Sequence, residues 1–180
     1  MSKVLEFLEI AGIEFNQQSV NLYRKLLVKE IGKFWEAWEA RDRWQMMNAI
    51  CDISFIYDSL YYMDWHINGH QNYHDTLNTI MGLSKVAEFT SEQVMECYEI
   101  VCHSNLSKFD NDLDEAVSTD LKYTKLNFDT HHLLLVGSGK YATFSSLDQF
   151  GNDGKLYPKG EFLKSLVNYI EPDFGDVIWN

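Results

Sequence analysis

The chain has 180 residues, of which 46% are hydrophobic and 23% are charged, and this composition is typical of one soluble globular domain with a sizeable core. The formal net charge of −12 argues against nucleic acid or an anionic membrane as the main partner. The same acidity fits a protein that holds divalent cations, although it is equally ordinary for solubility.

The sequence carries no sign of a membrane span or an export signal. No stretch approaches 18 consecutive apolar residues. The first ten residues, "MSKVLEFLEI", interrupt their apolar run with acidic side chains, which is unlike a signal peptide. The three cysteines, Cys51, Cys97 and Cys102, have no zinc-binding spacing. We therefore expect reduced core thiols in a cytoplasmic protein.

Helical periodicity dominates the first two-thirds of the chain, which contains no proline before Pro158. The spacing predicts helices over about 3–11, 19–40, 42–67 and 71–82. Asn68 and Gly69 are expected to end the third of these. A further helix begins at Thr90 or Ser91, and with Thr90 as the N-cap, Gln93 completes a capping box.

The pattern changes after about residue 127. The β-prone runs "LLLV" and "YATF" flank the turn sequence "GSGK" and predict a hairpin between about 133 and 145. "GNDGK" predicts another turn, and "EFLKSLVNYI" a short closing helix. The predicted fold is mostly α: a helical bundle over 1–127, and a small β-hairpin plus closing helix over 128–180 in the same domain.

The segment "LLVKEIGKFWEAWEARD", residues 26–42, predicts an amphipathic helix. Its expected buried face consists of Leu27, Ile31, Phe34, Trp35 and Trp38. The neighbouring face carries Lys29, Glu30 and Lys33, and Glu30 and Lys33 are three residues apart. This face is either half of a metal site that has lost a carboxylate or the solvated edge of a core helix.

Two further polar sets stand out. Asp52 lies within the apolar run "NAICDISFIYDSL", where a carboxylate is costly unless it accepts hydrogen bonds or binds a cation. Asn105 and Lys108 are three residues apart at the end of an apolar helix. They suit contact with a base edge or a phosphate oxygen, or a C-terminal cap in which Lys108 meets the helix dipole.

Common catalytic motifs are absent from the sequence. It contains no P-loop, no G-x-G-x-x-G, no G-x-S-x-G and no H-E-x-x-H. "GSGK" at 137–140 lacks both the following Ser or Thr and the preceding spacing of a P-loop, and therefore predicts a turn.

"LYRKLLVKEIGKFWEAWEARD" followed by "NAICDISFIYDSL" resembles the core of the all-α nucleoside triphosphate pyrophosphohydrolases, which include MazG-like and phosphoribosyl-ATP pyrophosphohydrolases. "NLSKFD" and the tail "Y…DGK…PKG.F" are similar to single-domain versions from bacteriophages and bacteria. The resemblance covers about residues 20–165. It implies a helical bundle in which E-E-x-x-E and E-x-x-D carboxylates bind Mg²⁺ and split a nucleoside triphosphate into monophosphate and pyrophosphate.

This chain keeps only part of that family pattern. The E-E-x-x-E positions fall on residues 29–33 and retain only Glu30, while the E-x-x-D positions fall on Ala49 and Asp52. The resemblance therefore implies Glu30 and Asp52 as ligands of Mg²⁺, or of Mn²⁺. The residues implied to bind the nucleotide are Lys29, Lys33, Asn48, Asn105 and Lys108. We expect Lys33 to pair with Glu30 or with a bound phosphate, and catalysis to be weak because carboxylates are missing.

Three functions compete at this point. The first is a weak nucleotide pyrophosphohydrolase acting on an NTP or dNTP, in which Glu36, Glu39 or Asp58 completes the site. The second is an inactive, phage-encoded protein that binds or sequesters a nucleotide. The third, an interaction protein with an aromatic surface, is the weakest, because Trp35, Trp38, Trp44 and Trp65 mostly occupy expected core positions. The resemblance also implies a homo-dimer or homo-tetramer.

Overall fold

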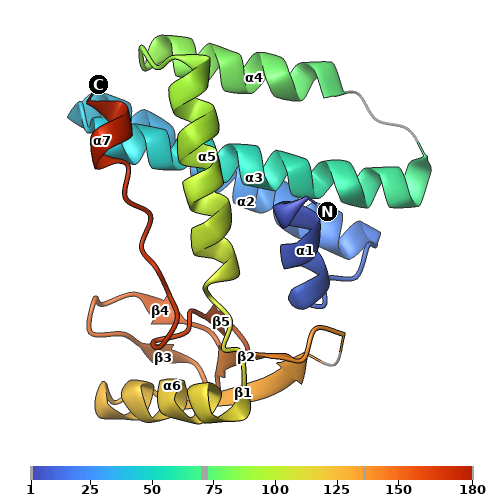
Figure 1. Cartoon of the computed structure of the whole chain (residues 1–180), viewed down its shortest axis with the longest axis vertical. Coiled ribbons are helices and arrows are strands. Elements are labelled where there is room, and N and C mark those ends of the chain that lie inside the picture. The colour runs from blue at the N-terminus through green and yellow to red at the C-terminus, as the bar shows by residue number, and fades with distance from the viewer. Residues whose placement is uncertain (1, 70–72, 136, 180) are drawn as a thin grey trace. The chain divides into compact units, whose positions relative to one another are not determined.

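The computed structural model describes residues 2–69, 73–135 and 137–179, and it is mostly helical with a small set of antiparallel strands near the C-terminus (Figure 1). This confirms the expected fold class at that level. Internal contacts divide the chain into two compact units. The first unit is Met1–Leu8, Ile13–Cys102 and Pro172–Asn180, and the second is Glu9–Gly12 and His103–Glu171. The expected boundary at residue 127 falls inside the second unit.

The first unit is built from helices. They are α1 (Lys3–Ile10), α2 (Gln17–Ala40), α3 (Arg43–Asn68), α4 (Tyr73–Val86), α5 (Ser91–Leu106) and α7 (Gly175–Ile178), and the last residues of α1 and of α5 belong to the second unit. The antiparallel pair α2 and α3 packs along its length. Phe34, Met47, Ile50 and Ile53 are completely buried in this core. The helices predicted over this part of the chain therefore form as α1 to α5, whereas α7 was not predicted. None of the described helices is long and apolar enough to cross a membrane.

Local sequence signals set the ends of these helices. Asn16 caps α2 by accepting a hydrogen bond from the Ser19 N–H at 2.9 Å. Gly69, with φ of 64°, ends α3 in the left-handed region, as the Asn-Gly pair predicts. At the start of α5 the Thr90 hydroxyl accepts from the Gln93 N–H at 3.2 Å, and the Gln93 amide oxygen accepts from the Thr90 N–H at 3.0 Å. The expected capping box is confirmed.

The second unit combines one helix with short strands. The helix is α6 (Leu113–Lys125), which packs against β1 (Thr130–Leu135) and β2 (Lys140–Ser145). β2 lies between β1 and β5 (Phe162–Leu163) in an antiparallel sheet, and β3 (Gln149–Phe150) pairs with β4 (Leu156–Tyr157). The predicted hairpin is confirmed, with Leu133 opposite Ala142. Helix α6 was not predicted.

The prediction of a closing helix for "EFLKSLVNYI" is wrong. Phe162 and Leu163 pair with β2 as a strand instead. The hydroxyl of Ser165, three residues after Phe162, donates to the buried carboxylate of Asp110. These tertiary contacts outweigh the weak helical pattern of the segment, and the last helix in the described chain forms later, at α7.

The three cysteines are buried and carry no disulfide, as expected. Burial raises the pKa of the Cys97 and Cys102 thiols to about 11. The thiols are therefore protonated near neutral pH, and they act as small apolar core side chains.

Candidate functional site

Glu30 is buried within the apolar stripe of α2. The stripe is formed by Val20, Tyr23, Leu27, Glu30, Phe34 and Ala37, at alternating spacings of three and four residues. Only 7% of the Glu30 surface is exposed. Of the two alternatives for the face that carries Glu30, the solvated edge of a core helix therefore does not hold for this residue. A carboxylate at a core position needs a compensating partner.

That partner is Lys33. Its ammonium nitrogen lies 2.8 Å from both Glu30 carboxylate oxygens and donates its hydrogen bond to Oε1. The expected pairing is confirmed. The Lys33 side chain is 47% exposed, whereas that of Glu30 is 10% exposed. One partner of this ion pair thus remains accessible to an anion from solvent, while the other is enclosed. Lys29, on the same helix, is exposed.

Most of the tryptophans lie outside the core, although the sequence predicted that they are buried. Trp35 and Trp38 are 45% and 46% exposed and contact each other edge to face, with ring centroids 6.0 Å apart. Trp65 is 59% exposed. Of the four tryptophans considered in the sequence analysis, Trp44 is partly buried, and its ring packs against Phe174. The premise that these tryptophans mostly fill the core is therefore wrong, and α2 is rotated so that Glu30 faces inward.

Asn48 and Asp52 lie one turn apart on α3. The Asn48 side-chain amide donates to Asp52 Oδ2 at 3.1 Å. Asp52 is half-buried. Its carboxylate accepts a hydrogen bond, which is one of the two alternatives that the sequence offered for this residue. Ala49, the other family position on this helix, is 2% exposed and belongs to the core. That Glu30 and Asp52 share one pocket stays a prediction.

The other carboxylates proposed to complete the site have different surroundings. Glu36 and Glu39 are exposed. Asp58 accepts a hydrogen bond from the Tyr98 hydroxyl, and burial raises the pKa of its carboxyl above the usual range. Over the described ranges, no three His, Cys, Asp or Glu side chains converge as metal ligands.

The residues present fit a divalent cation poorly, because of how Glu30 is already used. A cation that bound Glu30 would have to compete with the Lys33 ammonium, which lies 2.8 Å from both carboxylate oxygens, although Oε2 accepts no hydrogen bond among the described residues. Mg²⁺ needs oxygen ligands in octahedral geometry and usually at least one carboxylate. The pair therefore disfavours the expected Mg²⁺ or Mn²⁺ ligation by Glu30.

Asn105 and Lys108 come together in the second unit. The Lys108 ammonium donates to Asn105 Oδ1 at 2.6 Å, so the two side chains share a face as expected. Asn105 is buried and Lys108 is half-buried. Lys108 follows Leu106, the last residue of α5. That this pair binds the nucleotide stays a prediction.

Two of the hollows formed by the described residues have room for a ligand. One lies within the first unit, has a volume of about 900 Å³ and is lined by Trp38, Arg41 and Arg43 among others. The other lies within the second unit, has a volume of about 420 Å³ and includes Lys108 in its lining. Neither is lined by Glu30 or Asp52.

The smaller hollow contains residues that the sequence analysis missed. Lys155, Tyr157 and Lys164 line it together with Lys108. "GNDGK" was interpreted only as a turn, although its lysine is followed two residues later by an aromatic side chain. A lysine just before a short strand and a tyrosine within that strand do not by themselves predict a pocket.

Comparison with known proteins gives no family for the chain. No protein-family model, curated protein or solved structure matches it.

Proposed function

We propose that the protein is a nucleotide-binding protein of the MazG-like, all-α pyrophosphohydrolase type, and that its hydrolysis of an NTP or dNTP to monophosphate and pyrophosphate is weak. The observation that carries the proposal is the ion pair between buried Glu30 and half-exposed Lys33. In the resembling enzymes a carboxylate stands at the position of Lys33.

The pair supports binding more strongly than turnover. The Lys33 ammonium is a compact cation that can meet a phosphate oxygen. It cannot lower the pKa of a bound water to make a hydroxide nucleophile, as a metal ion does. When a phosphate takes over Lys33, the buried Glu30 carboxylate loses its partner, and this cost limits the affinity. We therefore expect modest nucleotide affinity and slow hydrolysis.

The experiment restores the missing carboxylate. Lys33→Glu is compared with the native chain and with Lys25→Glu, which makes the same charge change at an exposed position two turns earlier on α2. Ala49→Glu is avoided because it would bury a carboxylate in the core. Pyrophosphate release and thermal shift are measured across NTPs and dNTPs in Mg²⁺ and Mn²⁺.

We expect nucleotide-dependent thermal stabilisation of the native chain with little pyrophosphate release. Lys33→Glu should raise metal affinity and pyrophosphate release, whereas Lys25→Glu should behave like the native chain. Vigorous turnover by the native chain would contradict weak hydrolysis and favour completion of the site by other carboxylates. A native chain that no nucleotide stabilises would contradict nucleotide binding itself.

A further inference from the structure

The hollow of about 420 Å³ within the second unit, here called the hairpin pocket, lies between the end of α6, the β3–β4 hairpin and β5. Its aromatic lining consists of Tyr123, Phe128, Tyr157 and Phe162. A volume of this size lies within the range of pockets that hold small ligands. The proposed function is argued from Glu30 and Lys33 in the first unit, and of the residues implied to bind the nucleotide only Lys108 lines this pocket.

The aromatic wall is held in a fixed arrangement. Phe128 meets Tyr157 edge to face with ring centroids 5.0 Å apart, and it lies 5.7 Å from the Tyr123 ring. The Tyr123 hydroxyl donates to the Lys164 carbonyl at 2.9 Å. Tyr123 and Phe128 are buried, while Tyr157 is half-buried. Preorganised aromatic side chains of this kind bind flat heteroaromatic rings by stacking.

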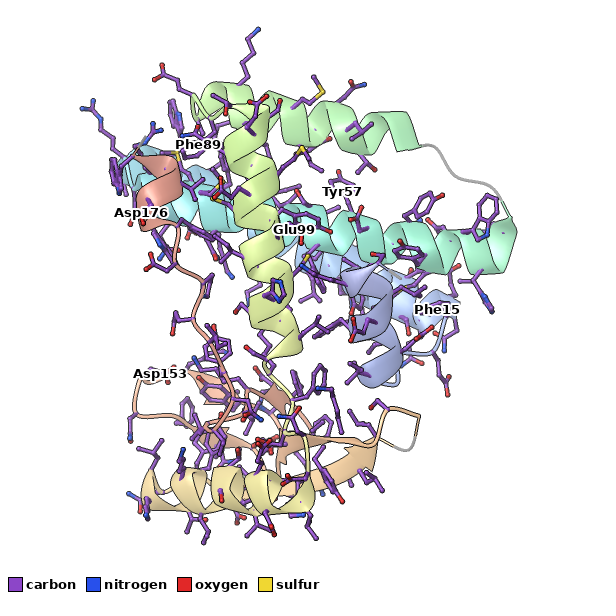
Figure 2. The ribbon with its side chains drawn as sticks, viewed as in Figure 1. Phe15, Tyr57, Phe89, Glu99, Asp153 and Asp176 are labelled. Carbon is purple, nitrogen blue, oxygen red and sulfur yellow. The ribbon has the colours of Figure 1, made fainter. Side chains whose placement is uncertain are left out.

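A tight turn shapes one side of the pocket. Gly151 lines it, and a Cβ atom there would lie 2.5 Å from Asp153 Oδ1 and 2.8 Å from Tyr157 Cε2. Asp153, which lies in this turn (Figure 2), accepts from the Lys155 N–H at 3.0 Å and from the Tyr157 hydroxyl at 2.9 Å. These hydrogen bonds lower the pKa of the Asp153 carboxyl. The turn therefore fixes Tyr157 and Lys155 relative to each other.

The pocket is basic although the chain as a whole is acidic. Lys108, Lys155 and Lys164 line it beside two carboxylates, Asp153 and Glu161, whereas the chain carries a net charge of −12. The Lys155 ammonium lies 4.3 Å from the centre of the Tyr157 ring and 3.0 Å from Glu161 Oε1. Lys155 is exposed, and exposed ion pairs of this kind are weak. A phosphate can therefore replace Glu161 as the partner of Lys155.

We propose that the hairpin pocket binds a heteroaromatic ring that carries a phosphate, as a nucleoside monophosphate does. The ring contacts Tyr157 and Phe128, and Lys155 meets the phosphate. The lysines favour a ring that carries a phosphate over an uncharged ring. The aromatic wall favours a phosphate that carries a ring over inorganic phosphate alone. This inference rests on the proposed function for its ligand class and assigns that ligand to the second unit.

The experiment is a titration of the full ¹⁵N-labelled chain with the four common nucleoside monophosphates, followed by amide chemical shifts. Gly151, Gly154 and Phe128 report on the hairpin pocket, and Glu30 and Lys33 report on the first unit. We expect saturable shifts at the first set, with weaker binding of a nucleoside or of inorganic phosphate. Shifts confined to Glu30 and Lys33 would overturn the pocket while leaving the proposed function standing. Shifts confined to the hairpin pocket would support the pocket and contradict nucleotide binding at Glu30 and Lys33.

Charge variants test the role of Lys155. Lys155→Gln should weaken binding about two- to fivefold, the range expected for one exposed ionic contact. Glu161→Gln should tighten it, because it removes the carboxylate that competes for Lys155. Lys159→Gln is the matched control, since Lys159 is exposed in the same segment and does not line the pocket. Equal effects of Lys155→Gln and Lys159→Gln would show a general charge effect and overturn the assignment.

Ring variants test the role of Tyr157. Tyr157→Leu should weaken binding roughly tenfold, within the range measured for loss of base stacking, while Tyr157→Phe keeps the ring and should retain binding. The amide spectrum of each variant shows whether the second unit remains folded. If inorganic phosphate binds the native chain as tightly as the monophosphates do, the pocket is an anion site only and the proposal for a ring is wrong.

Discussion

At the scale of single residues, the environment of Glu30 differs most from expectation. The large side chains of Trp35 and Trp38 suggested which face of α2 is buried, but the buried stripe passes through Glu30. Lys33 compensates the carboxylate from the solvent side. The pair therefore contributes to folding as well as to the candidate site.

Removal of the Lys33 ammonium tests the contribution of this pair to stability. Lys33→Met leaves the buried Glu30 carboxylate without the ammonium that pairs with it and should lower the free energy of unfolding by about 1–2 kcal/mol, less than for a fully buried pair because Lys33 is half exposed. Lys25→Met is the control and should change stability little. Urea unfolding measures both. Adding Glu30→Gln to Lys33→Met should recover part of the loss, and no recovery would contradict the coupling.

Asp110, the last residue of "NLSKFD", is a second buried carboxylate. It is 1% exposed and accepts hydrogen bonds from Thr119 at 2.9 Å and Ser165 at 2.5 Å, both through Oδ1. Oδ2 has no hydrogen-bond partner among the described residues. Burial is the main cause that raises the pKa of this carboxyl above 3.8, against the lowering effect of the two hydroxyls.

The raised pKa predicts how stability depends on pH. Because the folded chain holds this proton more tightly than the unfolded chain does, Asp110 favours folding below pH 3.8, and this contribution is lost as pH rises through the raised folded pKa. Asp110→Asn removes the titration. The variant should therefore gain stability relative to the native chain between pH 4 and pH 7. Thermal unfolding across that range tests this, and a difference that is constant with pH would contradict it.

At the scale of elements, α6 shows how a local signal was overlooked. Asp112 caps the helix by accepting from the Glu115 N–H at 2.9 Å, and the Glu115 carboxylate accepts from the Asn111 N–H at 2.7 Å. The sequence "DNDLDE" thus contains an N-cap followed three residues later by Glu, a helix-start signature. Asn168 also donates to Glu115 at 2.6 Å, which ties the start of α6 to a later segment of the same unit.

Loss of the cap should weaken this helix measurably. Asp112→Ala should lower stability by about 1 kcal/mol, because it removes the side-chain acceptor for the Glu115 N–H. Asp114→Ala is the matched control, since Asp114 is exposed in the first turn and loses only its interaction with the helix dipole, a few tenths of a kcal/mol. Amide hydrogen exchange in α6 measures both. Equal effects of the two substitutions would contradict a capping role.

At the scale of the whole molecule, exposed apolar side chains on α2 bear on assembly. Val28 is 71% exposed, and Trp35 and Trp38 are each nearly half exposed on the same helix. The resembling enzymes build four-helix cores from paired chains, and exposed aromatic and aliphatic side chains of this kind suit such pairing.

We therefore expect a mass of two or four times the 21.0 kDa chain in light scattering after size exclusion. Val28→Glu should shift the native chain toward monomer, because it places a charge on the exposed apolar side of α2. Leu121→Glu, at an exposed position on α6, is the control and should leave the mass unchanged. A native mass of one chain would contradict the prediction.

The sequence by itself determined helices α1 to α5, the capping box at Thr90, the end of α3 at Gly69 and the β1–β2 hairpin. These features depend on interactions between residues close in the chain, such as side-chain caps and turn conformations, so their signals are local. The pairing of Glu30 with Lys33 and of Asn105 with Lys108 was predictable for the same reason, since each pair is one helical turn apart.

Only the tertiary structure decided which face of α2 is buried and what becomes of residues 161–170. Glu30 is enclosed because α2 packs against α3, although its own side chain favours water. Phe162 and Leu163 form a strand because β2 offers them backbone partners, and Ser165 is fixed by Asp110, 55 residues earlier. Lys108 and Lys155 likewise line one pocket from distant parts of the chain. Contacts between residues so far apart leave no periodic pattern in the sequence.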